Sequence, residues 1–394
     1  MKALDELNLD VLGVNFTVIW GGGVTEAQRE GMARAWNRCL GNARRVTFAS
    51  EYRASVLSFT ASLHFDSTLP SCGVTHLSSD TFEGLAEAVT SEITVAAILE
   101  RAGELTMLHA CGVADPDGAV IALVAKSGTG KTTASSQLAR TFGYITDETV
   151  AIRADGTVVP YPKPLSVKQA TPGAAKLQVG PDELGLKVAP ANPRIRAIAL
   201  LDRVAGAEYQ LPVIEPVPLV EAVLALIPDT SSQAAVAQPL QSLCRLIDSV
   251  GGVFRVSYSE AADLRVSLAP LFQACPVELS DGDTEWVPAL TLPSTDPADQ
   301  AGGEPSGPLP AGWLQRTEAV DAVEIGGDLL VLTETELTRL SGIGPIIWQT
   351  ARRPVSMEEL VRRIEALHGL PEGYEALLDA AIDGLISQGL LLRG

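Results

Sequence analysis

The segment AKSGTGKTT at residues 125–133 carries the clearest chemistry in the sequence. It fits the pattern G-x-x-x-x-G-K-[ST], except that Ala125 takes the place of the first glycine. In such a loop, main-chain N–H groups surround a phosphate, the Lys131 ammonium neutralises the outer phosphates, and the Thr132 hydroxyl binds Mg²⁺. The pattern therefore predicts a site for ATP with Mg²⁺. The predicted phosphate-binding residues are Ser127, Gly128, Thr129, Gly130, Lys131, Thr132 and Thr133.

Two neighbouring acidic residues, Asp147 and Glu148, end an expected strand in the segment YITDETVAI. The strand that follows such a loop and its helix normally returns close to the loop. Phosphoryl transfer needs one carboxylate near Mg²⁺ and another near the attacking hydroxyl, and we favour this pair for both tasks. Asp202 ends the apolar stretch at residues 197–201 and is the alternative acid, but for it we favour a strand-end residue without a chemical role.

The elements around the loop are expected to run strand, loop, helix, strand, a βαβ-type phosphate-binding arrangement. A hairpin-type turn at residues 115–118 precedes the strand that enters the loop, and Gly143 is expected to end the helix. His109 lies on the strand before that turn, where a lone histidine is most often a core residue. The expected strands cover residues 105–111, 119–125 and 145–152, and the expected helix covers residues 131–142.

The chain is expected to contain three structured regions and one linker. Residues 1–104 are predicted to form an α/β lobe, with strands at 14–20 and 53–64 and helices at 25–39 and 81–101. Residues 105–274 are predicted to form the catalytic domain that contains the phosphate-binding loop, or P-loop. Residues 275–312 are rich in Pro, Gly, Asp, Ser and Ala and are predicted to be a flexible linker.

Residues 313–394 are strongly patterned and are expected to form a small α+β domain. Three short strands at 320–325, 329–333 and 337–340 are followed by three helices at 343–350, 356–368 and 371–388. Ser356 and Glu359 form a capping-box pattern at the start of the second helix. The domain has no cluster of residues for chemistry. A winged-helix domain fits the same order, although the negative charge of the chain disfavours DNA binding.

The P-loop region resembles a known family. His109 in LHACGVA, the loop SGTGKTT and the strand end TDETV are similar in order and spacing to the catalytic domain of HPr kinase/phosphorylase. The HPr-kinase-like enzymes of peptide natural-product clusters, including lasso-peptide kinases, also share a segment like PYPKPLS at residues 160–166. The resemblance covers about residues 105–272 and implies an ATP- and Mg²⁺-dependent kinase.

The resemblance also implies roles for single residues. Asp147 would be the general base toward a Ser or Thr hydroxyl, with His109 and Lys131 beside the reacting phosphate and Glu148 with Thr132 at the metal. The chain departs from the family at Ala125 and Glu148, and it lacks the family's downstream Glu-Ile-Arg-Gly signature. That last difference argues against HPr as the substrate. Arg194 and Arg196 are candidate phosphate contacts, with solvent-facing strand ends the favoured interpretation.

The C-terminal segments GIGPIIWQ, SMEELVRRI and AIDGLISQGLLL look like the PqqD fold. PqqD-like domains are the precursor-peptide recognition elements of ribosomal peptide biosynthesis, so the resemblance over residues 313–394 implies a leader-binding domain. An edge strand at residues 337–340 would offer unpaired main-chain groups to an extended leader. The predicted peptide-binding residues are Leu337, Thr338, Arg339 and Leu340.

Composition limits the partners and the compartment. The chain has 394 residues, 46% of them hydrophobic and 20% charged, with a net charge of −19, which disfavours nucleic-acid and membrane-surface binding. No apolar run approaches the ~20 residues needed to cross a bilayer, and the N-terminus does not resemble a signal peptide. The five cysteines are scattered, as in a protein of the reducing cytoplasm.

Together these features predict a cytoplasmic ATP-dependent kinase of the α/β class that phosphorylates a Ser or Thr hydroxyl on a ribosomally made precursor peptide. The precursor, held by its leader, is the expected partner, and a homo-oligomer is left open. Two alternatives remain open at this point. One is an ATP-hydrolysing maturation factor that transfers no phosphate, and the other is a non-catalytic docking protein that senses nucleotide.

Overall fold

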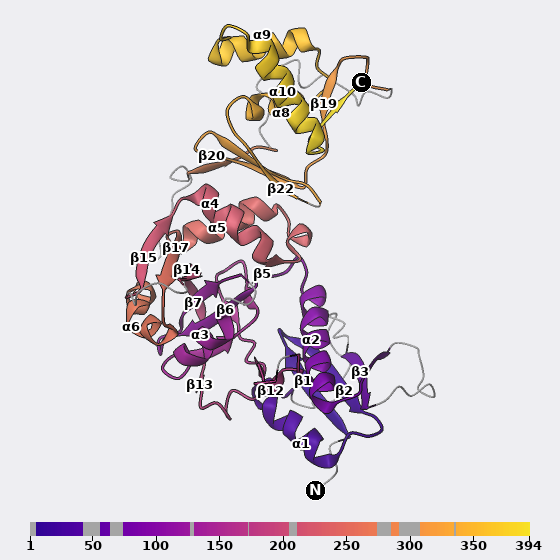
Figure 1. Ribbon diagram of the computed structural model, residues 1–394, viewed down its shortest axis with the longest axis vertical. Coiled ribbons are helices and arrows are strands. Elements are labelled where there is room, and N and C mark those ends of the chain that lie inside the picture. Colours follow the sequence, from indigo (N-terminus) through magenta and orange to yellow (C-terminus); the bar gives the residue numbers. More distant parts are fainter. Residues whose placement is uncertain are drawn as a thin grey trace. The chain divides into compact units, whose positions relative to one another are not determined.

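The computed structural model describes residues 5–41, 56–63, 74–126, 130–171, 173–204, 211–273, 285–290, 308–334 and 336–394. The chain is a mixed α/β protein with several sheets, and it divides into two compact units (Figure 1). Unit 1 comprises Met1–Pro218, Ala225–Val236 and Leu246–Glu278. Unit 2 comprises Leu219–Leu224, Ala237–Arg245 and Leu279–Gly394. Within the described ranges, no helix has the length and apolar character needed to cross a membrane.

The N-terminal part of unit 1 is a four-stranded sheet packed against a long helix (Figure 1). The sheet order is β1-β2-β3-β4, with the first pair antiparallel and the other pairs parallel. Thr81 caps the long helix by accepting a hydrogen bond from the Gly84 N–H. The elements are β1 (Glu6–Val11), β2 (Val14–Trp20), α1 (Glu26–Ala35), η1 (Asn37–Cys39), β3 (Val56–Leu63), β4 (Val74–Ser79) and α2 (Phe82–Glu100).

A seven-stranded sheet forms the centre of unit 1, in the order β13-β8-β6-β7-β14-β17-β15. Strand β6 pairs antiparallel with both β7 and β8, so β7 and β8 run parallel and α3 connects them across β6. This confirms the expected strand, loop, helix, strand order. The elements are β6 (Ala110–Ala114), β7 (Ala119–Val124), α3 (Lys131–Leu138), β8 (Gly143–Thr146), β13 (Lys187–Val188), β14 (Arg194–Arg203), β15 (Val213–Val217) and β17 (Val253–Tyr258).

Smaller elements complete unit 1 and its boundary with the rest of the chain. A second sheet has the order β10-β9-β5-β16, and β11 pairs with β12 as a hairpin. The boundary between the two units falls inside α4 and α5. The elements are β5 (Thr106–Leu108), β9 (Val150–Ile152), β10 (Val158–Val159), β11 (Leu165–Val167), β12 (Leu177–Val179), α4 (Leu219–Leu226), η2 (Ile227–Asp229), β16 (Thr230–Ser231), η3 (Gln233–Ala235), α5 (Pro239–Ser249), η4 (Ala261–Asp263), α6 (Leu264–Ser267) and α7 (Ala269–Phe272).

Four expectations for unit 1 were wrong at their boundaries, and one of them is the strand expected over 145–152, which is divided into β8 and β9. The strand expected over 105–111 breaks at His109, whose main-chain N–H donates to the Asp229 carbonyl at 2.6 Å, so β5 and β6 join different sheets. The helix expected over 131–142 ends at Leu138. Gly143 begins β8 instead of ending that helix. A Cβ on Gly143 would lie 2.7 Å from the Ala189 Cα, so the close approach of the chain explains this glycine.

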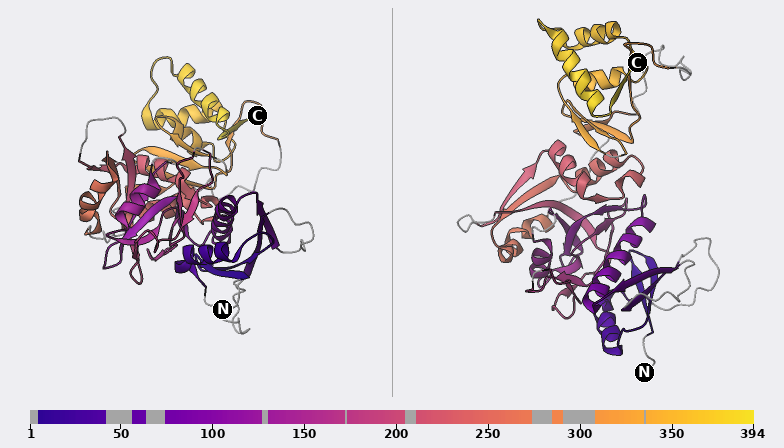
Figure 2. Two further views of the ribbon diagram at one scale, coloured as in Figure 1. Left: turned by 60° about the horizontal axis from the view of Figure 1, so that its bottom comes forward. Right: turned by 45° about the vertical axis from the view of Figure 1, so that its right-hand side comes forward.

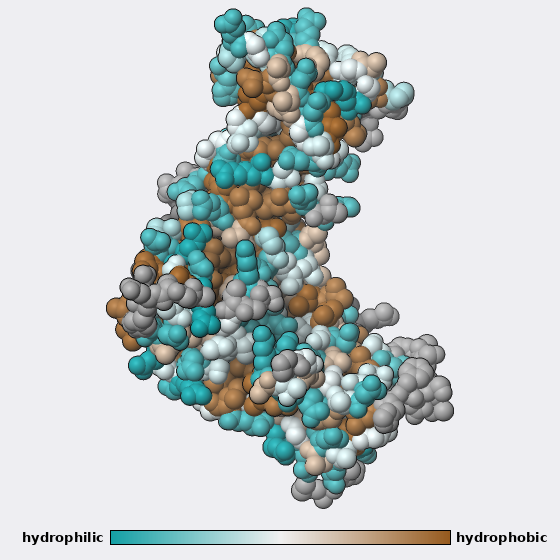
Figure 3. All heavy atoms as spheres, viewed as in Figure 1, coloured by the Kyte–Doolittle hydropathy of each residue, from teal (hydrophilic) through white to brown (hydrophobic). Residues whose placement is uncertain are grey.

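The C-terminal part of unit 2 has a four-stranded sheet, β18-β20-β21-β22, with three helices packed on one face (Figure 2). The three expected strands and three expected helices are confirmed within a few residues. On the face seen in Figure 3, hydrophilic and hydrophobic residues are interspersed over this part of the chain. The elements are β18 (Trp286–Pro288), β19 (Leu314–Arg316), β20 (Asp321–Ile325), β21 (Asp328–Leu332), β22 (Leu337–Leu340), α8 (Gly344–Thr350), α9 (Met357–His368), α10 (Tyr374–Ser387) and β23 (Leu391–Arg393).

The flexible linker predicted at residues 275–312 needs a correction. Inside it, β18 pairs antiparallel with β20, with Trp286 opposite Ile325 and Pro288 opposite Val323. The buried Trp286 side chain supplies apolar surface that the average composition of the stretch conceals. The parts of this stretch at 275–284 and 291–307 lie outside the described residues.

Candidate functional site

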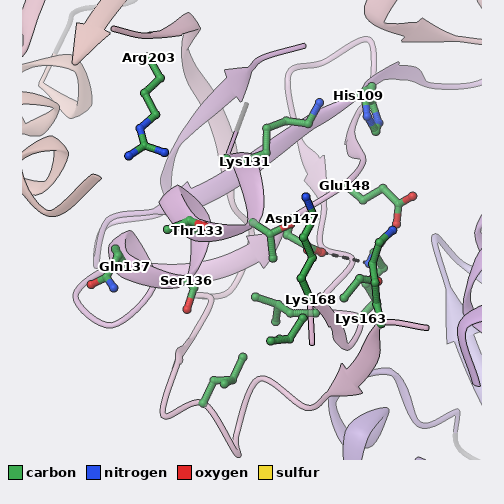
Figure 4. A pocket seen from close by; sticks show the side chains of 17 residues that line it. His109, Lys131, Thr133, Ser136, Gln137, Asp147, Glu148, Lys163, Lys168 and Arg203 are labelled. Atoms are coloured by element: carbon green, nitrogen blue, oxygen red, sulfur yellow. Dashed lines mark ion pairs between the residues drawn. The ribbon is translucent and has the colours of Figure 1, made fainter. Parts of the chain in front are cut away.

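One cavity of about 890 Å³ in unit 1 gathers most of the residues that the sequence singled out (Figure 4). It lies where the loop leaves β7 and where α3 begins. The predicted residues that line it are His109, Gly130, Lys131, Thr132, Thr133, Asp147 and Glu148. The predicted loop residues Ser127, Gly128 and Thr129 lie outside the described residues. The further lining residues are Ser136, Gln137, Lys163, Leu165, Ser166, Val167, Lys168, Lys176, Leu184 and Arg203.

The phosphate side of the cavity is built from the start of α3. Gly130 precedes the helix with a φ of 103°, a left-handed conformation that glycine adopts without strain. The Lys131 ammonium donates a hydrogen bond to the Ala125 carbonyl at the other end of the loop. Burial lowers the pKa of Lys131, and nearby Asp229 is the foremost carboxylate opposing that shift. The N–H groups at this helix end and the lysine form an electropositive corner suited to phosphate.

The acidic pair lies in a bend between β8 and β9, where the sequence predicted one continuous strand. The Thr146 hydroxyl makes the bend by accepting hydrogen bonds from the main-chain N–H groups of Glu148, at 3.2 Å, and Thr149, at 3.3 Å. The bend places both Asp147 and Glu148 at the cavity wall. Asp147 is 5% exposed.

A buried lysine, Lys163, holds this acidic pair (Figure 4). Its ammonium lies 3.1 Å from Asp147 Oδ1 and 2.9 Å from Glu148 Oε2, and it also donates to the Pro164 carbonyl at 3.2 Å. Burial lowers the pKa of Lys163, but the attraction of the two carboxylates outweighs that effect and raises it above the usual lysine value. Burial raises the pKa of Glu148, and Lys163 outweighs it and holds the value below normal. Glu148 is therefore ionised at neutral pH.

The hydrogen bonds at Asp147 make its two oxygens different. Oδ1 accepts from the Tyr144 hydroxyl at 3.1 Å and faces the Lys163 ammonium. Burial raises the pKa of Tyr144 well above its ordinary value, with the Asp147 charge adding to the effect, so the phenol keeps its proton and donates. Oδ2 has no hydrogen-bond partner among the described residues. Oδ2 is therefore the oxygen free to accept a proton from a substrate.

His109 also lines the cavity, at the break between β5 and β6. The charges of Glu148 and Asp229 act on its imidazole and favour the protonated form. Burial, reinforced by the Lys131 ammonium, holds the pKa of His109 below its ordinary value, so the ring is neutral at pH 7. A neutral imidazole here can contact a phosphate as a hydrogen-bond donor without adding charge.

The residues at the end of β14 divide between the two faces of the sheet. Ala197, Ala199 and Leu201 pack in the same core cluster as α3, so alternation places Arg203 on the α3 face and Asp202 on the other. Arg203 lines the cavity and Asp202 does not. The favoured interpretation of Asp202, a strand-end residue outside the site, agrees with this geometry.

The arginines at the start of β14 are remote from the site. Arg194 donates hydrogen bonds to the Thr157 hydroxyl, at 3.4 Å, and to the Asp155 carbonyl, and neither Arg194 nor Arg196 lines the cavity. Strand direction explains this, because Arg194 pairs with Ala119 at the opposite end of β7 from the loop. The phosphate-contact candidate in this strand is therefore Arg203.

Sequence reasoning missed four cations of the cavity: Lys163, Lys168, Lys176 and Arg203. Lys163 stands inside the quoted PYPKPLS segment, where a lysine between two prolines was the available signal. Residues 197–201 of β14 are uniformly apolar, so no alternation in the sequence indicated the face on which Arg203 lies. No comparable pattern marks Lys168, which follows β11.

The residues present fit a magnesium ion bound together with phosphates. Mg²⁺ prefers oxygen ligands and is usually held by one or two carboxylates with substrate phosphates and water. The Thr132 hydroxyl and the carboxylates of Asp147 and Glu148 line the same cavity. In the described part of the chain, no three His, Cys, Asp or Glu side chains gather into a metal site on their own.

The predicted peptide-binding residues lie in unit 2 on β22, at one edge of its sheet. Thr333 donates its main-chain N–H to the Glu336 carbonyl at 2.9 Å. This bond shows which opposed residues of β21 and β22 form hydrogen-bonded pairs. Because hydrogen-bonded pairs alternate in antiparallel strands, Thr338 bonds to Val331, whereas Leu337 and Arg339 direct their main-chain groups to the open edge. Among the strands that the structure describes, none pairs with this edge.

Comparisons with known proteins give little direct guidance. No protein-family model matches the chain, and no curated protein matches it. Among solved structures, an HPr(Ser) kinase/phosphatase from Coxiella burnetii matches with 12% sequence identity and a TM-score of 0.22. The match covers 42% of this chain and 93% of that chain. A likeness at this level identifies neither the fold nor the function of the protein.

Proposed function

We propose that the protein is an ATP-dependent kinase that transfers a phosphoryl group to a Ser or Thr hydroxyl. The observation that carries the proposal is the content of the cavity. The P-loop lysine Lys131 and Thr132 lie at the start of α3, and the carboxylates of Asp147 and Glu148, held by Lys163, line the same wall. Phosphoryl transfer needs this combination of phosphate-binding groups and a base.

The proposed reaction assigns a task to each group. The acceptor hydroxyl oxygen attacks the γ-phosphorus, a new O–P bond forms, and the bond to the β-phosphate oxygen breaks, so that ADP leaves. Asp147 Oδ2 takes the hydroxyl proton, while Tyr144 and Lys163 hold Oδ1 in place. Lys131 neutralises charge on the phosphates, and Thr132 with Glu148 would hold Mg²⁺. When bound, Mg²⁺ supplies charge neutralisation and orientation of the phosphates.

For the acceptor, we propose a ribosomally made precursor peptide whose leader adds a strand to β22. Support comes from the sequence resemblance to PqqD-like domains and from the main-chain groups of Leu337 and Arg339, with which no described strand pairs. Strand addition would bring affinity through main-chain hydrogen bonds, and the chemistry would remain in unit 1.

Phosphoryl transfer can be tested with synthetic peptides that represent the short reading frames beside the gene. The full-length protein, Mg²⁺ and ATP are expected to add one phosphoryl group to a Ser or Thr, as detected by mass spectrometry. Asp147→Asn should slow the transfer by about 10²–10⁴-fold with little change in ATP affinity, because the amide cannot accept the proton. Asp202→Asn is the matched control and should react normally. Free phosphate without peptide modification would instead favour an ATP-hydrolysing maturation factor, and no turnover would favour a nucleotide sensor.

Leader binding can be tested at Arg339, where two substitutions distinguish the contribution of the main-chain N–H from that of the side chain. Arg339→Pro removes a donor that faces the open edge, whereas Arg339→Ala keeps it and removes only the ion pair with Asp328. The proline variant should raise KM for the full precursor and leave kcat on a leaderless peptide unchanged. Equal KM values for both variants would contradict leader docking at β22.

A further inference from the structure

The cavity contains more positive charge than its own carboxylates neutralise. Its five cations are Lys131, Lys163, Lys168, Lys176 and Arg203. Two of them are paired: Lys163 with Asp147 and Glu148, and Lys176 with Glu87 at 3.3 Å. Within the described ranges, no carboxylate lies within 4 Å of the ammonium or guanidinium nitrogens of Lys131, Lys168 or Arg203. In a chain of net charge −19, three cations left facing one cavity indicate a strongly anionic ligand.

Arg203 is the best placed of these cations for an oriented contact. It is the last residue of β14 and faces the same side of the sheet as α3 (Figure 4). Its Nε donates to the Ser259 carbonyl at 3.3 Å, which leaves both terminal nitrogens available to a ligand. The β14–β7 register places Leu200 opposite Val124, so Arg203 extends past the point where the loop begins.

Tyr258 lies between the strand end that carries Arg203 and Gly130, the residue before α3. It pairs with Arg203 across β14 and β17, and a Cβ on Gly130 would lie 3.9 Å from its hydroxyl oxygen. The main-chain N–H of Val204 donates to the Tyr258 carbonyl at 2.9 Å, which fixes the strand end. Arg203 therefore lies on the strand pair that reaches the residue before α3, and it lines the same cavity as Gly130 and Lys131.

We propose that Arg203 binds the γ-phosphate of the nucleotide and thereby distinguishes a triphosphate from a diphosphate. This inference rests on the proposed kinase function. The N–H groups at the start of α3 and Lys131 would hold the phosphates nearest the helix, while the outermost phosphate carries the most charge and needs another cation. A guanidinium can donate to two phosphate oxygens at once, which a lysine cannot.

The test is calorimetric binding of two magnesium nucleotides, ADP and the non-hydrolysable ATP analogue AMP-PNP, to the full-length chain. Arg203→Gln should weaken AMP-PNP binding about 10-fold or more and ADP binding less than about threefold, because a charge-assisted contact to the γ-phosphate is lost. Arg203→Lys should recover part of the preference. Arg203 is exposed, so these variants should fold. Arg196→Gln, on the same strand outside the cavity, is the matched control and should bind both nucleotides normally.

The outcomes separate this inference from the proposed function. Equal weakening of both nucleotides, or no change, would overturn the role of Arg203 while the wild-type binding still supports a nucleotide site. Loss of the triphosphate preference in Lys168→Gln, but not in Arg203→Gln, would also overturn it. Failure of the wild-type chain to bind either nucleotide would overturn both this inference and the proposed kinase.

Discussion

Lys163 shows why single residues decide the character of the site. Two adjacent carboxylates at a buried wall would repel each other, and one would take up a proton. A buried ammonium offsets this repulsion by pairing with one oxygen of each carboxylate, Asp147 Oδ1 and Glu148 Oε2. The acid pair was predictable from its place after the loop and helix. Its counter-ion was not, because a contact made 15 residues later depends on how the intervening chain folds.

Removal of the buried lysine should be costly for stability. Lys163→Met leaves two carboxylates near each other without a counter-ion, and breaking a buried ion pair typically costs about 3–5 kcal/mol. Urea unfolding at pH 7 measures the loss. Lys176→Met is the matched control, because that ion pair with Glu87 is half-exposed and should be worth about 0–1 kcal/mol. Similar small losses in both variants would contradict the structural role of Lys163.

The difference between wild type and Lys163→Met should depend on pH. Because folding lowers the pKa of Glu148, its stabilisation is present above the unfolded carboxyl pKa and is lost as pH falls through the folded value. Because folding raises the pKa of Lys163, its stabilisation is present below the unfolded lysine pKa and is lost as pH rises through the folded value. The gap in unfolding free energy should be widest between about pH 5 and about pH 10. A gap that stays constant down to pH 3 would indicate a packing defect alone.

At the scale of elements, the periodicity of the sequence predicted which helices and strands exist better than it predicted the residues at which they begin and end. The helices at 131–138 and 357–368 and the edge strand at 337–340 follow from local pattern and capping. The break at His109 does not, because it is made by a hydrogen bond to the distant Asp229. Strand β18 was hidden because its few apolar residues lie in a stretch of linker-like composition. The side of β14 that carries Arg203 was also hidden, because residues 197–201 are apolar on both faces of the strand.

Gly143 offers a test of how closely two elements approach. A Cβ there would lie 2.7 Å from the Ala189 Cα and 2.9 Å from the Val188 carbonyl oxygen, so Gly143→Ala forces β8 and β13 apart. We expect a loss of about 1–3 kcal/mol in unfolding free energy, the usual cost of overpacking. Gly22→Ala is the matched control, because a Cβ there meets no atom within 4 Å. A loss of unfolding free energy no larger than that of Gly22→Ala would show that β8 and β13 can move apart at little cost.

At the scale of the whole molecule, the sequence suggested three regions, and the structure divides into two compact units with boundaries inside α4 and α5. A break within helices is invisible to periodicity, since the apolar pattern of a helix continues across it. The first turns of α5 belong to unit 2, where the main-chain N–H of Gln241 donates to Asp321 at 3.0 Å and its side-chain amide donates at 2.9 Å.

Replacement of the buried Asp321 is expected to change the stability of unit 2 without changing that of unit 1. Asp321 is 1% exposed and also accepts from the Ala322 N–H at 2.8 Å, so all its bonds come from unit 2. Asp321→Ala leaves three buried donors without their acceptor, at about 1–3 kcal/mol for each unsatisfied group. Calorimetry should show a lower-temperature unfolding transition for unit 2, while the protection of unit 1 by magnesium nucleotide persists. Asp328→Ala, which removes only the partly exposed ion pair with Arg339, should shift it little. If Asp321→Ala abolished nucleotide protection as well, the two units would have to unfold as one.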